Sequence, residues 1–505
     1  MSNENIFDAL TKRSAGDLGS PQRFRRTAGS CPGLLRRMTL QKELEGHRGC
    51  VNTVSFISSG DVLVSGSDDQ QVMLWDWKTG ERQLTYHSGH SGNVFQARLL
   101  PESGNVMVTL GADGRVRVGH LPQGGAAPET REIGKHRGCA HKLGIMENSP
   151  NVFLSCGEDG HICQYDLRQE TPFTSMLVAR DANSCRIGLN AISCNPCNSW
   201  QVAACGADPH VLVYDIRSLA TPPSDRGIVE QDRGEPSVKP VRWIIPDAIK
   251  NNNGHMHMHM SSVVYSQNGE ILGSYNREKV YLFAADGCRG NRAAVLNRDG
   301  EEEEGGSADD GSFEGHRNAA TVKGVSFFGP SDEYVLSGSD CGHLFWWSKR
   351  DGVLQQLLKG DEHVVNCLEP HPTQPLALAS SGIDNTVKKW GPTADAASFD
   401  QAAAKSVMEE NAAREADDSR GPMFHISPQL LLRYLQATEL TRSQQAGMAG
   451  RGELTARGFR VTETTVGMQE AEAVAEVEIT INDDPGREPT LEEHRRGIRS
   501  ECIIS

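Results

Sequence analysis

The sequence has no apolar run of 18 residues and no apolar core of a secretory signal, although it is 505 residues long. A membrane-spanning helix needs about 20 apolar residues, so we expect no transmembrane span and no signal peptide. Positive charge is scarce relative to negative charge, and the net charge is −15. Because contacts to phosphates need a basic surface, this balance argues against direct nucleic-acid binding.

Motifs that build catalytic sites are missing as well. There is no Gly-Lys phosphate loop, no Gly-x-Ser-x-Gly turn, no His-Glu-x-x-His helix and no set of protein-kinase motifs. Nothing in the sequence names a nucleophile or a general base. We therefore expect a binding protein rather than an enzyme, with no catalytic residue and no cofactor.

The cysteines do not form a disulfide framework. All 13 are scattered, mostly in segments with the character of strands, which suits a reducing compartment. Cys194 and Cys197 lack a second Cys or His pair at zinc spacing, which favours a structural thiol pair over a metal site.

A run of alternating His and Met at residues 255–260 is the other metal candidate. In a strand, alternation would place three histidines on one face, where they could bind copper or zinc. However, the run leads directly into the strand-like residues 263–265. This favours a loop-to-strand junction, so no metal site is assigned.

What the sequence does contain is a repeat that extends from about Gly46 to Trp390. A residue near the end of each unit, aromatic in all but one, marks seven positions: Trp75, Gly119, Tyr165, Tyr214, Phe283, Trp347 and Trp390. A period of about 40–45 residues with Gly-His early and Trp-Asp late is typical of four-stranded propeller blades. Seven units can close a ring with no open sheet edge. We expect an all-β, seven-bladed WD40 β-propeller over residues 45–392.

Histidines and aspartates recur at fixed places in the repeat. Gly-His dipeptides end at His47, His90 and His316, and His136 and His363 keep only the histidine. Aspartates in turns precede most of the marker positions: Asp69, Asp113, Asp159, Asp208 and Asp384, with Asp340 one place earlier. Buried His–Asp pairs usually satisfy polar atoms between strands, so we expect a structural role rather than repeated catalytic dyads.

Residues 1–44 precede the repeat and are basic. Between residues 23 and 42 there are no acidic side chains and six basic ones: Arg23, Arg25, Arg26, Arg36, Arg37 and Lys42. Interleaved apolar residues predict an N-terminal arm with one or two short helices, broken around residues 31–33. A disordered basic leader is the alternative.

Two insertions and a long tail surround the later repeats. The insertions cover about residues 218–256 and 285–312, and the second contains the acidic run 301–304. Such a run is most often a solvated loop, and a site for a basic peptide is the alternative. The Ala/Glu-rich tail, residues 393–505, is expected to be partly helical near 428–440 and otherwise mostly disordered.

The last four residues, 502–505, match the C-a-a-X prenylation pattern. Cys502 is therefore a candidate prenylation site, and a chance match is the alternative. Arginines just upstream would help at an anionic membrane, so a peripheral membrane location is considered beside nucleus and cytoplasm.

Two consecutive units end in almost the same way. Asp166 and Arg168 follow Tyr165, and Asp215 and Arg217 follow Tyr214. Each Asp-x-Arg sequence would follow the third strand of its blade, so the two guanidinium groups would lie side by side on one face. Arginine forks suit carboxylates and carbonyls of a partner. The structural alternative is an ion pair with the neighbouring aspartate.

Five segments of the sequence resemble those of a known protein family: residues 44–53, 88–97, 315–325, 337–343 and 364–372. The chain resembles the WD-repeat substrate receptors of cullin-4 RING ubiquitin ligases, which dock on the large subunit of damaged-DNA-binding protein. Within that family it is most similar to the branch called DDB1- and CUL4-associated factor eight, or WD-repeat protein forty-two. The resemblance covers about residues 40–440.

The resemblance implies a docking site for the adaptor. It would be formed by the two Asp-x-Arg sequences and by the arm at about residues 20–42: Asp166, Arg168, Asp215, Arg217, Arg23, Arg25 and Arg26. The opposite face would hold an unknown protein substrate for ubiquitination. A chromatin- or histone-binding propeller and a membrane-recruited scaffold, both without a ligase role, are the competing interpretations.

Overall fold

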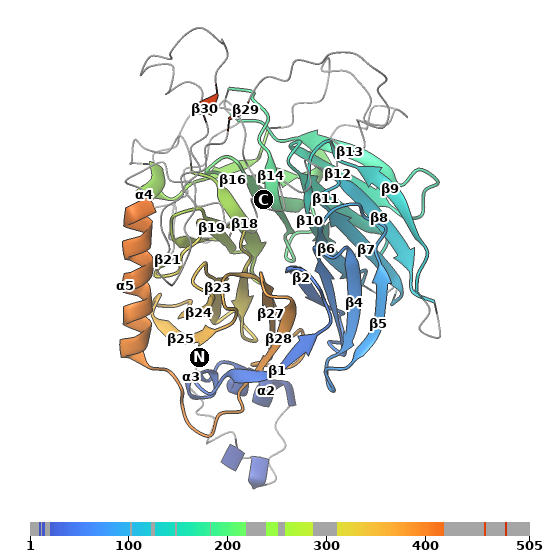
Figure 1. Cartoon of the computed structure of the whole chain (residues 1–505). Helices are drawn as coiled ribbons and strands as arrows, with labels where there is room; N and C mark the ends of the chain where they lie inside the picture. Colours follow the sequence, from blue (N-terminus) through green and yellow to red (C-terminus); the bar gives the residue numbers. More distant parts are fainter. Residues whose placement is uncertain are drawn as a thin grey trace. The chain divides into compact units, whose positions relative to one another are not determined.

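The computed structural model describes residues 10–11, 13–15, 21–101, 104–122, 127–146, 149–181, 183–218, 239–250, 258–285, 311–418, 459–460 and 480–481. The chain divides into two compact units, Met1–Ala416 and Asp417–Ser505. In the first unit, seven sheets of four strands each stand as blades around a central axis (Figure 1). The expected all-β, seven-bladed propeller is confirmed.

Blades one to four follow the chain in order. Blade one contains β2 (Val51–Phe56), β3 (Val62–Ser67), β4 (Gln71–Asp76) and β5 (Arg82–His87). Blade two contains β6 (Val94–Leu99), β7 (Val106–Gly111), β8 (Arg115–His120) and β9 (Thr130–Lys135). Blade three contains β10 (Ala140–Ile145), β11 (Val152–Gly157), β12 (His161–Asp166) and β13 (Phe173–Val178). Blade four contains β14 (Leu189–Cys194), β15 (Gln201–Gly206), β16 (Val211–Asp215) and β17 (Arg242–Ile244).

The remaining blades complete the ring. Blade five contains β18 (Met260–Tyr265), β19 (Ile271–Tyr275), β20 (Val280–Phe283) and β21 (Gly311–Phe313). Blade six contains β22 (Val325–Phe328), β23 (Tyr334–Gly338), β24 (His343–Ser348) and β25 (Leu354–Lys359). Blade seven contains β26 (Val365–Pro370), β27 (Leu378–Gly382), β28 (Thr386–Gly391) and β1 (Thr39–Glu45).

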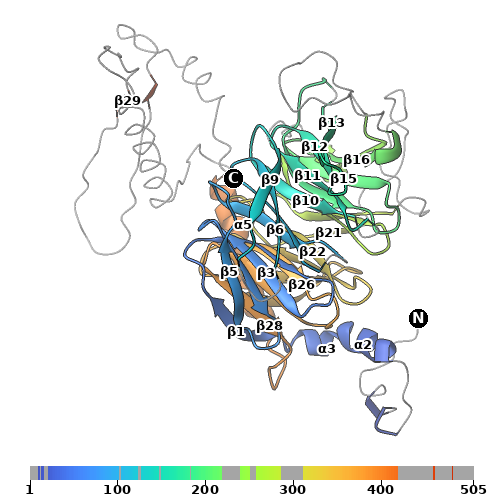
Figure 2. The same cartoon turned by 90° about the vertical axis from the view of Figure 1, so that its right-hand side faces the viewer.

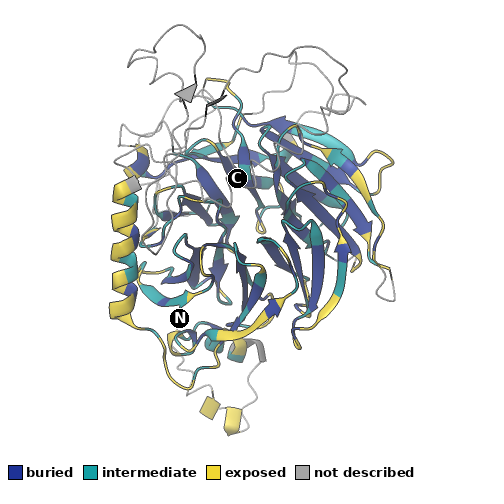
Figure 3. Ribbon diagram, viewed as in Figure 1, coloured by how far each residue is buried: buried dark blue, intermediate teal, exposed yellow. Residues whose placement is uncertain are grey.

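The middle strands of each blade carry the core. All six residues of β7 are buried, whereas the outer strand β5 exposes both its ends. A sheet covered on both faces has near-continuous apolar strands rather than alternating ones, and each blade here lies between two neighbours. Figure 3 shows the same distribution, with buried residues concentrated in the strands.

Ring closure joins the two ends of the propeller sequence. β1 pairs antiparallel with β28, so the strand that precedes blade one is the outer strand of blade seven. The innermost strand β2 contacts β6 on one side and β26 on the other. The propeller sheet thus begins at Thr39, earlier than the boundary at residue 45 expected from the repeat. Only Leu44 of β1 is buried, so no apolar alternation marks this strand.

Side chains connect the inner strands around the ring. Ser55 of β2 donates a hydrogen bond to the Ala97 carbonyl of β6 at 2.7 Å. In the same way, Tyr265 N of β18 donates to Ser193 Oγ of β14 at 3.1 Å. Because the inner edge of a blade has no further strand beside it, such bonds satisfy backbone groups that would otherwise be left unpaired.

Blade one shows how the recurring histidine and aspartate are used. Trp75 Nε1 donates to Ser65 Oγ at 2.9 Å, and Ser65 Oγ lies 2.8 Å from His47 Nε2. His47 Nδ1 in turn lies 3.0 Å from Asp69 Oδ2. Equivalent chains join His90 to Thr109 and Asp113, and His136 to Ser155 and Asp159. These buried chains have the structural role that the sequence predicts.

Blades four and seven keep the aspartate but change its partner. Asp208 contacts His210, two residues later in the same turn, at 2.6 Å. In blade seven, the buried Lys388 ammonium lies 3.1 Å from Asp384 and 2.7 Å from Asp361. A buried cation therefore takes the place that histidine has in blades one to three.

Two short helices form the N-terminal arm, α2 (Pro21–Gly29) and α3 (Pro32–Leu35) (Figure 2). Pro32 opens α3, a position where its missing N–H is not needed. Leu35 and Met38 are fully buried in a core cluster with residues of blades six and seven. The arm is therefore attached to the propeller at its C-terminal end.

Helix α5 (Gln401–Asp418) follows blade seven, in the tail expected to be partly helical but before the place expected for its helix. Asn411 donates to the Gly315 carbonyl at 2.8 Å, and Met408 packs against the cluster beneath β25. Figure 1 shows α5 along the outer side of blade six. Within the second unit, β29 (Phe459–Arg460) pairs with β30 (Thr480–Ile481). The helix expected near 428–440 and Cys502 lie outside the described residues.

The expected insertions are only partly described. The first contains α4 (Asp247–Lys250) and β17, which is the outer strand of blade four, and the second ends in β21. The acidic run 301–304 lies outside the described residues. Of the His–Met run, Met260 begins β18 and is fully buried, and Met258 packs against the same cluster. In the part of the chain that the structure describes, no helix has the length and apolarity of a membrane span.

Candidate functional site

Each Asp-x-Arg sequence forms a tight turn at the end of a third strand. Asp166 is the last residue of β12, and its Oδ1 accepts a hydrogen bond from the backbone N–H of Arg168 at 3.1 Å. Asp215 ends β16 and accepts from Arg217 N at 2.9 Å. Aspartate favours such turns because its side chain replaces a backbone acceptor. The aspartate thus sets the direction in which the chain leaves the strand.

The same carboxylates hold the arginine side chains as two-pronged ion pairs. Arg168 donates from Nε to Asp166 Oδ1 at 2.8 Å and from Nη2 to Oδ2 at 2.7 Å. Arg217 makes the matching bonds to Asp215 at 3.0 and 2.6 Å. These hydrogen bonds lower the pKa of both carboxyls and raise the pKa of both guanidinium groups. The pairs therefore stay charged near neutral pH.

The ion pair with the neighbouring aspartate, which the sequence left as the structural alternative, is thus present in both blades. It does not cover the arginines, since the side chains of Arg168 and Arg217 are 66% and 58% exposed. The aspartates are much more enclosed, at 11% and 21%. Each carboxylate occupies one edge of a guanidinium group and leaves most of its surface in water.

The arm lies on the same face of the ring as the two turns. In a four-stranded meander, the turn after the first strand and the turn after the third strand open on one face. Arg168 and Arg217 follow third strands. Tyr334 begins β23, just after the first turn of blade six, and its hydroxyl donates to the Ser30 carbonyl of the arm at 3.1 Å. Leu376, in the first turn of blade seven, shares a core cluster with Leu35.

The arm presents basic side chains on this face. Arg25 and Arg26 are exposed on α2. The side chain of Arg23 lies outside the described residues. Arg36 is partly buried, and its Nη2 donates to Gln355 Oε1 at 3.1 Å. Arg36 therefore helps to attach the arm to the propeller, whereas the exposed Arg25 and Arg26 are accessible to a partner.

Sequence reasoning did not single out Trp200, which lies beside Arg217. Trp200 is in the first turn of blade four, and its carbonyl accepts from Ile216 N at 2.8 Å. The guanidinium carbon of Arg217 is 5.9 Å from the centre of the Trp200 ring. The signal available in the sequence was a tryptophan at the end of the polar segment 195–200.

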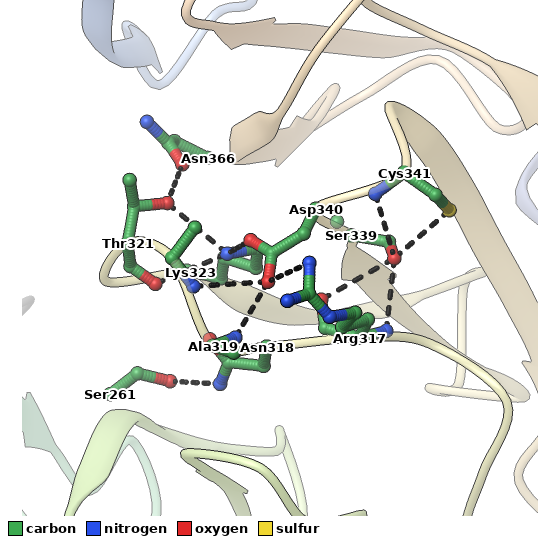
Figure 4. Close-up of polar contacts among 12 residues, drawn as sticks. Ser261, Arg317, Asn318, Ala319, Thr321, Lys323, Ser339, Asp340, Cys341 and Asn366 are labelled. Carbon is green, nitrogen blue, oxygen red and sulfur yellow. Dashed lines mark hydrogen bonds and ion pairs between the residues drawn. The ribbon is translucent and has the colours of Figure 1, made fainter. Parts of the chain in front are cut away.

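Blade six contains a second polar cluster, shown in Figure 4. Cys341 stands at the turn position that Asp69 has in blade one, four residues after the buried serine. Asp340 instead forms a buried ion pair with Lys323, and both side chains are at most 1% exposed. Arg317 Nη1 lies 3.7 Å from the same carboxylate. Figure 4 shows these groups pointing toward one another inside the blade, so the cluster is structural.

This change leaves His316 without the aspartate expected for it. Among the described residues, neither ring nitrogen of His316 has a hydrogen-bond partner. The ring packs edge-on against Trp347 at 5.6 Å between centres. Burial lowers the pKa of His316 to about 4. Nor does the described part of the chain bring together three or more His, Cys, Asp or Glu side chains that could hold a metal ion.

Comparison with known proteins agrees with the fold. The repeat family described as WD domain, G-beta repeat matches residues 38–76, 310–348 and 352–391. The chain is 31% identical over 300 residues to WD and tetratricopeptide repeats protein 1 of Mus musculus, covering 56% of this chain and 44% of that protein. It is 30% identical over 277 residues to DDB1- and CUL4-associated factor 6 of Homo sapiens, covering 54% and 31%. A third relative is Protein ALTERED SEED GERMINATION 2 of Arabidopsis thaliana, 29% identical over 306 residues, covering 55% and 39%.

These alignments span less than half the length of each relative. The branch of factor eight, suggested by the sequence, stays a prediction. The first matched segment contains β1 and the strands β2–β4 of blade one, the second contains β21 and β22–β24, and the third contains β25 and β26–β28. The chain is therefore a seven-bladed β-propeller that contains WD40 repeats, and it is similar to proteins with WD repeats.

Proposed function

We propose that this protein is the substrate-recognition subunit of a cullin-4 RING ubiquitin ligase. It docks on the large subunit of damaged-DNA-binding protein and presents a protein for ubiquitination. The observation that carries the proposal is the pair of exposed Asp–Arg forks in consecutive blades, on the face that also bears the basic arm. A relative at 30% identity is named for its association with DDB1 and CUL4, which supports the proposal.

The geometry suits docking because the arginines are already oriented. Asp166 and Asp215 hold the two guanidinium groups in place before a partner arrives. A side chain that is ordered in advance loses less conformational entropy on binding. The exposed edges can then donate to carboxylates or carbonyls of the adaptor. The opposite face of the ring is left for the substrate.

WD40 propellers are typically non-catalytic scaffolds, which fits a receptor that positions a substrate for another subunit. We place the protein in the nucleus and cytoplasm. The histone-binding and membrane-scaffold interpretations rest on residues 301–310 and on Cys502, which lie outside the described residues. No observation on the described residues favours either of them.

The test is affinity purification of the wild type and the Arg168→Ala/Arg217→Ala variant, with mass spectrometry of both eluates. Both arginines are more than half exposed, and exposed ion pairs contribute little to stability. The variant should therefore fold and lose the adaptor and the cullin.

A matched control removes two other exposed arginines, Arg131 on the outer strand β9 and Arg137 at the opposite face of blade three. The Arg131→Ala/Arg137→Ala variant should retain both ligase subunits. Equal recovery of the adaptor with the wild type and the Arg168→Ala/Arg217→Ala variant would refute the proposed docking site. If the adaptor were absent from every eluate, including that of folded wild-type protein, the receptor function itself would be refuted.

A further inference from the structure

Trp200 is the one aromatic side chain among the large apolar residues that the described structure exposes, and it is 48% exposed. Most exposed apolar residues on a propeller need no explanation. Trp200 differs because it lies on the proposed docking face, within the same blade as Arg217. Val241, which precedes the outer strand of that blade, is also 43% exposed.

The turn that carries Trp200 is held by hydrogen bonds. The Asn195 side chain accepts from Cys197 N at 2.9 Å and donates to Gln201 Oε1 at 3.0 Å. The backbone N–H of Trp200 donates to Asn198 Oδ1 at 3.3 Å. These bonds fix the backbone that carries the indole, and about half of Trp200 stays exposed to water.

Trp200 and Arg217 form one composite surface. The distance of 5.9 Å between the guanidinium carbon and the ring centre is within the range of a cation–π contact, about 6 Å. Asp215 holds the Nε and Nη2 edge of the same guanidinium group. A partner that buries this surface meets an apolar ring and a positive charge side by side. It must offer an apolar pocket bordered by carboxylate or carbonyl oxygens.

Blade three lacks this arrangement, although its turn is otherwise equivalent. Leu167 N donates to the Asn151 carbonyl at 3.0 Å, as Ile216 N does to Trp200. A polar asparagine thus stands at the place of the indole. The two Asp–Arg forks are therefore unequal, and only the fork of blade four is combined with a large apolar ring.

We infer that Trp200, together with Arg217, is the main anchor of the adaptor interface, and that it inserts into an apolar pocket bordered by acidic or carbonyl groups on the adaptor. This inference rests on the proposed function. Tryptophan and arginine are the residues most often found to dominate binding energy at interfaces. The inference adds to the proposed docking site the residue that contributes most to the binding energy and the chemistry of the surface that it binds on the partner.

The experiment measures the Kd of the full chain for the purified adaptor with Trp200→Ala, Trp200→Gln and Trp200→Phe. Asn151→Ala, in the equivalent turn of blade three, is the matched control. We expect Trp200→Ala and Trp200→Gln to weaken binding at least about tenfold. Trp200→Phe should keep affinity within about threefold, because it retains an apolar ring, and Asn151→Ala should bind as the wild type does. Unchanged thermal unfolding separates an interface effect from a loss of structure.

Wild-type affinity in a folded Trp200→Ala or Trp200→Gln variant would overturn the inference. If Arg168→Ala/Arg217→Ala still weakened binding in that case, the proposed function would stand without the anchor. If none of these variants, including the arginine pair, changed the Kd, both the anchor and the proposed docking site would fail. Losses as large with Asn151→Ala as with Trp200→Ala would also overturn the inference, because the indole would have no special role.

Discussion

Ser65 accepts a hydrogen bond from the indole N–H of Trp75 at 2.9 Å, and both side chains are buried. The Ser65 hydroxyl thereby joins a strand at the centre of blade one to the His47–Asp69 pair at its edge. This single hydroxyl forms hydrogen bonds with two buried partners, so its removal should lower the free energy of unfolding by a measurable amount.

We predict that Ser65→Ala lowers the free energy of unfolding by about 2–4 kcal/mol, because Trp75 and His47 each lose a buried partner. Ser337→Ala is the matched control. Ser337 is equally buried, but among the described residues its hydroxyl donates only to the neighbouring Gly338 carbonyl, so we expect a loss of at most about 1 kcal/mol. Urea denaturation of both variants makes the comparison, and equal losses would contradict the role given to the hydrogen-bond chain.

Strand β1, which closes the ring, contains one buried and one exposed leucine whose contributions to stability can be compared. Leu44 is 2% exposed and packs between blades, whereas Leu40 on the same strand is 41% exposed. Leu44→Ala should cost about 3 kcal/mol of unfolding free energy, and Leu40→Ala less than about 0.5 kcal/mol. Similar midpoints of denaturation for the two variants would argue against β1 as the strand that closes the ring.

His316 should make stability depend on pH. Burial lowers the pKa of its ring from 6.5 to about 4 in the folded state. Between these values the unfolded chain binds a proton that the folded chain does not, so stability is complete above about pH 6.5 and falls as the pH decreases toward about 4. From about pH 7 to about pH 5, the wild type should lose about 2 kcal/mol more than His316→Phe. The measurement is urea denaturation across this range, and parallel curves would show that His316 is not responsible.

The arm is expected to contribute to docking through charge. Arg25 and Arg26 are exposed on α2, and substitution of exposed residues rarely affects stability by more than about 0.5 kcal/mol. Arg25→Ala/Arg26→Ala should weaken adaptor binding several-fold and leave the melting temperature unchanged. The loss should shrink as salt is raised, because exposed charges are screened. A salt-independent Kd ratio would indicate that these arginines act other than through charge.

Much of the fold could be predicted from the repeat because its marker residues occupy fixed places in each blade. Trp75, Trp347 and Trp390 are all buried near the ends of third strands. β1 escaped detection because one buried residue, Leu44, cannot produce a visible alternation. Helix α5 escaped for a similar reason, since Ala404 and Asn411 are its only buried residues among those the structure describes.

The site was predictable in part. The repeated Asp-x-Arg sequence located Arg168 and Arg217 at equivalent turns, because position in a repeat fixes position in a blade. The contact of Arg217 with Trp200 depends on two turns that are separate in sequence and adjacent only in the folded blade. In blade six the turn aspartate, Asp340, stands one residue earlier in the sequence than in the other blades. It pairs with Lys323, and His316 is left without a hydrogen-bond partner among the described residues. The sequence shows the shift, but its effect on His316 depends on the packing of the blade.

The central claim is that Arg168 and Arg217 together hold the adaptor. The most direct test is the Kd of the purified full chain for the purified large subunit of damaged-DNA-binding protein, measured for the wild type and for Arg168→Ala/Arg217→Ala. We predict a loss of affinity of about a hundredfold or more with an unchanged melting temperature, because two pre-oriented, charge-assisted contacts are removed. Equal affinity of the two proteins would contradict the account and leave the Asp–Arg pairs as structural turns.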